Sequence, residues 1–107
     1  MSEPRLATGL WVAALLRRVH AAGDFATVLH RGDDTAGSVV LVHRHRHAVR
    51  RAIARAIGSD QRYHWRSIVE DDSVNSWIEG QRRFDVDLWV VELDTPDLAR
   101  FIDETID

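Results

Sequence analysis

Three histidines alternate with two arginines near the middle of the chain, and their types and spacing suggest metal chemistry. His43, His45 and His47 stand two residues apart, so a strand would place three imidazoles on one side, where they could bind zinc with one open position. Alternate residues of a strand lie about 6 to 7 Å apart, whereas two nitrogens on one zinc lie within roughly 3.5 Å. Arg44 and Arg46 also oppose a cation. A solvated strand end is therefore favoured, and zinc is the weaker alternative.

Arginines gather around the same histidines and form a candidate site for nucleic acid or a phosphorylated ligand, because guanidinium groups bind phosphate through two hydrogen bonds. Tyr63 and Trp65, further along, could stack on bases. The five candidate anion-binding residues are Arg44, Arg46, Arg50, Arg51 and Arg55.

The charge distribution offers a second explanation for these arginines. Residues 43–66 carry seven arginines and one acid, a net charge of +6, whereas residues 67–107 carry three arginines and twelve acids, a net charge of -9. The whole chain has a net charge of -3, and domains dedicated to nucleic acid are usually strongly basic. We therefore favour pairing between the two regions, within one chain or across a homo-oligomer, over nucleic acid.

Two further segments carry candidate residues. His30, Asp33 and Asp34 could hold a divalent cation or transfer protons, but Gly and Asp are also the residues that a turn between two strands needs, and we favour the turn. Residues 82–87, which begin with Arg82 and Arg83, could form an exposed recognition corner. Basic residues at a helix end followed by acids are equally typical of ordinary helix capping.

Composition excludes several chemistries. The chain has no cysteine, which rules out disulfides, thiolate nucleophiles and cysteine-bound metals, and all fourteen basic residues are arginine, which rules out a Schiff-base lysine. Neither a Gly-x-Ser-x-Gly nor a His-Glu-x-x-His motif occurs. The apolar run 10–16 is far shorter than the roughly 20 residues that span a bilayer. We therefore predict a cytoplasmic protein with no membrane partner, no catalytic residue and no cofactor.

The elements that position these residues follow from hydrophobic periodicity and turn signals. We predict an α+β fold in one domain, residues 1–107, with a four-stranded antiparallel or mixed sheet packed by N-terminal and C-terminal helices. Two nearly continuous apolar segments, 39–42 and 88–93, are the expected central strands. The predicted order is helix 4–23, strands 25–31 and 38–45 joined as a hairpin, basic helix 48–57, strand 63–69, helix 73–83, strand 86–93, and a last helix from Pro96 to Ile106.

Several blocks of the chain resemble a bacterial family catalogued as domain of unknown function 1491. The blocks are residues 5–6, 8–18, 31–33, 36–37, 82–85 and 87–92, among them Arg31-Gly32-Asp33 and Asp87-Leu88-Trp89. The resemblance implies a compact cytoplasmic domain. It implies no activity, cofactor or catalytic residue, because none is established for that family.

Three hypotheses for function remain after these observations, and no specific activity is assigned. The leading one is a small non-catalytic protein-interaction module whose partner is itself or another protein. The alternative is anion binding through the five arginines. The third and weakest is a small metal protein or enzyme that uses His30, Asp33 and Asp34 or the three alternating histidines.

Overall fold

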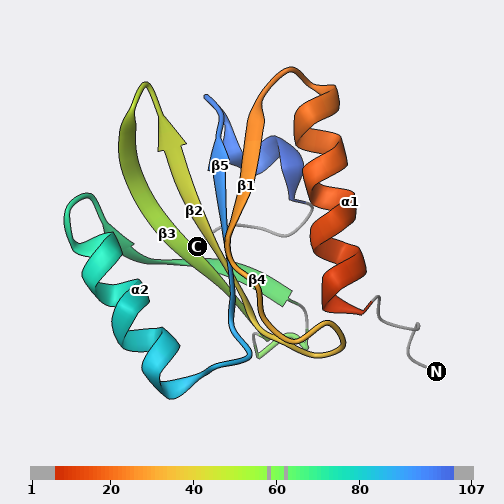
Figure 1. Cartoon of the computed structure of the whole chain (residues 1–107), viewed down its shortest axis with the longest axis vertical. Coiled ribbons are helices and arrows are strands. Elements are labelled where there is room, and N and C mark those ends of the chain that lie inside the picture. Colours follow the sequence, from red (N-terminus) through yellow and green to blue (C-terminus); the bar gives the residue numbers. More distant parts are fainter. Residues whose placement is uncertain (1–6, 58, 62, 103–107) are drawn as a thin grey trace.

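The most apolar segments of the chain form the middle of a five-stranded mixed sheet (Figure 1). The structure is a computed structural model that describes residues 7–57, 59–61 and 63–102. Its strands lie in the order β1-β5-β2-β3-β4. The elements are α1 (Thr8–Ala21), β1 (Phe25–His30), β2 (Val39–His45), β3 (Ala48–Ile57), β4 (Tyr63–Glu70), α2 (Ser73–Phe84), β5 (Trp89–Asp94) and the short 3-10 helix η1 (Leu98–Phe101). The predicted α+β class and mixed sheet are confirmed, and the predicted four strands are corrected to five.

The two predicted central strands lie side by side. β5 runs parallel to β2 and antiparallel to β1, and its residues Val90 and Val91 are fully buried. The predicted hairpin between β1 and β2 is therefore wrong, because β5 lies between them. A strand that is apolar on both faces gains most burial with a neighbour on each side, and β5 reaches that position from the far end of the sequence.

The segment 48–57, predicted as a basic helix, is the strand β3, which pairs with both β2 and β4. Its inward residues alternate as strand residues do, with Ala52 on one face of the sheet and Ile53 on the other. A bulge in the β2–β3 pairing leaves Arg50 without an opposite residue, which breaks the period of two. As a result, the apolar residues Val49 and Ile53 stand four positions apart, a spacing that is also typical of a helix.

The β2–β3 hairpin turns through two residues, Arg46 and His47, which both have positive φ, 53° and 66°. Two-residue hairpin turns of this kind favour Asn-Gly, since other residues pay a steric cost in this region. We expect the double substitution Arg46→Asn and His47→Gly to raise the free energy of unfolding by about 1 kcal/mol, measured by urea denaturation. A control with Arg46→Gln and His47→Gln removes the same side chains without easing the backbone. An equal gain in that control would assign the effect to charge repulsion instead.

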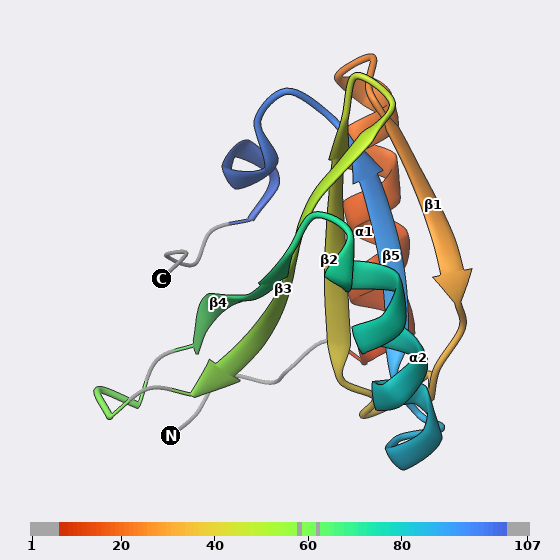
Figure 2. The same cartoon turned by 90° about the vertical axis from the view of Figure 1, so that its left-hand side faces the viewer.

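The sheet is covered on both faces. On one face, α1 places Val12, Leu15 and Val19 in a core that also contains Leu98 and Phe101 of η1. The core on the other face is built mainly on the apolar residues of β2 and β5, and α2 adds Val74 and Ile78 to it. Figure 2 shows β3 and β4 bending out of the plane of β2 and β5 toward the side where η1 lies.

The two ends of the described chain differ in how closely they follow the prediction. α1 ends before Gly23, whose φ is +87°, as the glycine predicted. The last helix is shorter than predicted. It is the 3-10 helix η1, which ends at Phe101, and Ile102 is extended. Ile106 lies outside the described residues. None of the helices in the described part of the chain is long and apolar enough to cross a membrane.

Candidate functional site

The three alternating histidines do not gather around a common point. His43 forms a hydrogen bond through Nε2 with the backbone oxygen of Thr95, 2.8 Å away, and His47 lies in the turn between β2 and β3. His45 ends β2. Among residues 7–57, 59–61 and 63–102, no three side chains that could bind a metal lie close together. His43 therefore ties β2 to the segment after β5, a structural role.

The five candidate arginines are divided between the two faces of the sheet. Arg44 Nε lies 3.2 Å from Glu92 Oε1, on the face that α2 covers. The guanidinium of Arg55 lies on the opposite face, 5.6 Å from the ring centre of Trp11, which itself stacks on Trp65. Arg44 and Arg55 therefore cannot contact the same small ligand.

The three remaining arginines lie at the hairpin tip or beside acids. Arg46 occupies the turn, Arg51 lies opposite Glu70 in the β3–β4 pairing, and the Asp71 N–H donates to the backbone oxygen of Arg50. Glu70 and Asp71 thus neighbour this part of β3 along the backbone, and charge pairing of Arg50 and Arg51 stays a prediction. Arg62, another arginine of the basic segment 43–66, lies outside the described residues.

The aspartates of the loop between β1 and β2 are engaged in holding that loop. The Asp33 carboxylate accepts hydrogen bonds from the N–H groups of Thr35 and Ala36, at 3.0 and 2.9 Å. Asp34 forms an exposed ion pair with Arg31, at 2.8 Å. This is the turn chemistry that the sequence favoured.

The same loop also joins distant parts of the chain. The Trp89 indole N–H donates to the backbone oxygen of Asp33 at 2.7 Å, and the Asp33 N–H donates to the backbone oxygen of Asp87 at 3.0 Å. At the start of α1, where no side chain caps the helix, the Gly9 N–H donates to the backbone oxygen of Asp34 at 2.8 Å. Three of the blocks that carry the family resemblance, residues 8–18, 31–33 and 87–92, therefore meet at this loop, and these contacts stabilise the fold.

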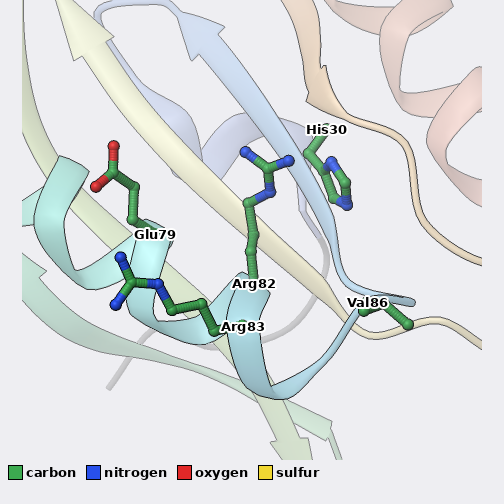
Figure 3. Close-up of a pocket in the computed structure, with 5 residues that line it drawn as sticks. All are labelled: His30, Glu79, Arg82, Arg83 and Val86. Atoms are coloured by element: carbon green, nitrogen blue, oxygen red, sulfur yellow. The ribbon is translucent and has the colours of Figure 1, made fainter.

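A hollow of about 360 Å³ lies between the C-terminal half of α2 and the end of β1 (Figure 3). A bulge in the β1–β5 pairing precedes His30, which lies opposite Val90 and so belongs to the face that α2 covers. Arg82 extends from α2 toward His30, while Arg83 points away from it. The residues that line the hollow are His30, Glu79, Arg82, Arg83 and Val86.

The polar groups around this hollow lack partners within the described chain. Arg82 and Arg83 form no ion pair or hydrogen bond with the residues that the structure describes. His30 Nε2 is shielded from water and also has no hydrogen-bond partner among them. The unpartnered His30 Nε2 is costly because it is buried, whereas Arg82 and Arg83 are exposed to water and available for contact with another molecule.

Two apolar side chains at the end of α2 and just after it are highly exposed. Phe84 is 91% exposed and Val86 is 76% exposed, although both belong to types that are commonly buried. We call the surface formed by His30, Arg82, Arg83, Phe84 and Val86 the α2 corner. Residues 82–87 were predicted as a possible recognition corner. His30 and Glu79 were not connected with it, because no local signal in the sequence shows that β1 reaches α2.

A family model and two of the similar solved structures name the same family. The model of a family described as "Protein of unknown function (DUF1491)" matches residues 6–103. The crystal structure of a DUF1491 family protein from Caulobacter crescentus CB15 is 34% identical, with a TM-score of 0.84, over 96% of this chain and 100% of that chain. An NMR structure of a DUF1491 family protein from the same organism is 33% identical, with a TM-score of 0.83, over 98% and 99%. The solution structure of protein Atu0922 from A. tumefaciens is 32% identical, with a TM-score of 0.79, over 97% and 98%. No curated protein matches the chain.

Proposed function

The chain belongs to the DUF1491 family of proteins of unknown function, and from that premise we propose that it is a non-catalytic protein-interaction module that binds its partner through the α2 corner. The observation that carries this proposal is the combination at one site of Phe84, 91% exposed, with two arginines that have no ion pair in the described chain. Aromatic residues and arginine are the types most enriched where protein interfaces gain their binding energy.

The energetic argument rests on what a partner would bury. Covering a phenylalanine side chain stabilises a complex by about 1.5 to 3 kcal/mol. An arginine beside it makes the contact specific for one orientation, because its planar guanidinium group forms two parallel hydrogen bonds with a carboxylate. The hollow between α2 and β1 adds a concave surface into which a partner side chain fits. These features favour an acidic protein surface as the partner.

The two other functional hypotheses have weaker support from the geometry. The arginines proposed for anion binding are spread over both faces of the sheet, with Arg44 paired to Glu92. Among the residues proposed for metal or acid–base chemistry, His43 and Asp33 are engaged in hydrogen bonds that hold the fold. The α2 corner combines two exposed arginines with an exposed aromatic side chain, a combination that supports protein binding.

The test is a comparison of captured proteins between two matched variants. The first removes the corner through Arg82→Ala, Arg83→Ala and Phe84→Ala. The control also removes two exposed arginines and an exposed phenylalanine, but elsewhere, through Arg17→Ala, Arg100→Ala and Phe25→Ala. Each is used as bait in an extract of the source bacterium, with cross-linking and quantitative mass spectrometry.

We expect a defined set of partners, which can include the chain itself, to bind the wild type and the control and to be lost from the corner variant. Partners that bind the corner variant as well as the wild type would contradict the proposal. So would the absence of any captured partner, the chain itself included.

A further inference from the structure

Strand β1 forms one edge of the described sheet, because β5 is the strand that pairs with it and lies on its inner side (Figure 1). An edge strand presents N–H and C=O groups to which a strand of another chain can bind. β1 also carries two exposed apolar side chains, Phe25 at 70% and Leu29 at 50%. Such an edge favours pairing between chains unless something covers it.

The outward-facing backbone groups of β1 belong to alternate residues. The Asp24 N–H, just before the strand, donates to the backbone oxygen of Val19 at 3.1 Å. The Ala26 N–H donates to His20 Nε2 at 3.3 Å. Both acceptors belong to α1, so residues 24 and 26 face away from β5, and Val28 is the next residue to do so. The regular edge ends at Val28, because a bulge follows it.

The imidazole of His20 covers both backbone groups of Ala26. Its Nε2 lies 3.1 Å from the Ala26 oxygen and 3.3 Å from the Ala26 nitrogen. With a proton on Nε2 the ring donates to the oxygen, and without one it accepts from the N–H, so either tautomer holds the ring on the edge. In the described part of the chain, Val28 is therefore left as the regular edge residue of β1 whose outward groups have no partner.

Without His20, this edge would match a second copy of itself. Antiparallel pairing centred on Thr27 places Ala26 of one chain opposite Val28 of the other, and residues paired in this way exchange two backbone hydrogen bonds. The same register brings Phe25 of each chain near Leu29 of the other, and apolar pairs across strands stabilise a sheet. We infer that His20 blocks this pairing and so prevents the sheets of two chains from joining through β1.

This role of His20 is separate from partner binding at the α2 corner. His20 belongs to α1, which packs on the face of the sheet opposite to α2. Substitution of His20 therefore leaves the α2 corner in place. Any self-association through that corner would be the same in wild type and variants, and would not hide a change at β1.

Three substitutions test the inference. His20→Ala uncovers Ala26, and alanine suits a helix. His20→Gln is the matched variant, because a glutamine amide can reach the same place and both donate and accept. Thr27→Lys, combined with His20→Ala, puts two like charges directly opposite each other in the proposed pairing. Arg17→Ala, at another exposed position of α1, is the control. Sedimentation velocity over a range of protein concentrations measures mass, and circular dichroism shows that each variant is folded.

We expect His20→Ala to self-associate at least about tenfold more strongly than the wild type, because the backbone groups of Ala26 and Val28 become available together. His20→Gln and Arg17→Ala should behave as the wild type does. Adding Thr27→Lys to His20→Ala should return the mass to that of the wild type.

A His20→Ala protein that is folded and has the mass of the wild type at every concentration overturns the inference. It is also overturned if His20→Gln associates as strongly as His20→Ala, or if Thr27→Lys leaves the association unchanged. Each of these results leaves the proposed function standing, since the capture experiment depends on Arg82, Arg83 and Phe84 alone.

Discussion

Replacing Gly32 with alanine is expected to remove a large share of the free energy of unfolding. A Cβ atom at this position would overlap the backbone oxygen of Asp87 and lie 2.6 Å from Cδ1 of Trp89. Neither neighbour can move easily, because Asp87 accepts a hydrogen bond from the Asp33 N–H and Trp89, only 2% exposed, donates to the Asp33 oxygen. We expect the free energy of unfolding to fall by about 4 kcal/mol or more, a large share of the roughly 5 to 15 kcal/mol of a typical domain.

Two further alanine substitutions show whether this loss comes from the clash. Gly37→Ala should be similarly severe, since its Cβ would meet the same Asp87 oxygen and lie 2.9 Å from Trp89 Cδ1. Gly80→Ala, in α2, meets nothing within 4 Å and should raise the free energy of unfolding by about 0.5 to 1 kcal/mol. Urea denaturation followed by circular dichroism measures all three. A Gly32→Ala protein as stable as the wild type would show that the loop and the strand separate easily enough to admit the extra carbon.

The elements with a strong, uninterrupted period were predictable from the sequence. The spacing of Val12, Leu15 and Val19 places one face of α1 in the core, and those residues are buried. The α2 helix between Ser73 and Phe84 is also confirmed, within one residue of its expected end. β5 begins at Trp89, three residues later than predicted, because residues 86–88 belong to the turn after α2.

The strand β3 could not be identified from periodicity alone. Ala52 and Ala54 are small enough to count as apolar on any face, and arginine and alanine favour helix in isolation. The Arg46-His47 turn lacks the Asn-Gly signal of a two-residue hairpin. Pairing with β2 on one side and β4 on the other overrides these local preferences.

The candidate site required strand order, which local signals do not contain. The sequence indicates a possible exposed corner at Arg82 and Arg83, but His30 is about fifty positions earlier in the chain. It reaches the same hollow only because β5 lies between β1 and β2 and brings β1 to the edge of the sheet. A sequence pattern reveals a pair of neighbouring arginines. It does not reveal which distant strand completes their surroundings.

Replacing Thr95 with valine is expected to lower the free energy of unfolding by about 2 kcal/mol, measured by urea denaturation. Thr95 is 1% exposed, and its hydroxyl donates to Asp24 Oδ2 at 2.8 Å and accepts from the Asp97 N–H at 3.3 Å. Valine has nearly the same shape, so the packing is kept while both hydrogen bonds are lost. A hydrogen bond to a charged carboxylate contributes more than one between neutral groups, which sets the size of the effect.

A serine at position 95 separates the hydroxyl from the methyl group of threonine. Thr95→Ser keeps both hydrogen bonds and should cost only about 1 kcal/mol, the amount associated with one buried methyl group. Combining Thr95→Val with Asp24→Ala should be less damaging than the sum of the two single changes, by about 1 kcal/mol or more, because both remove the same bond. If serine costs as much as valine and the two changes are additive, the methyl contact, and not the link between Asp24 and Thr95, holds the start of β1 to the end of β5.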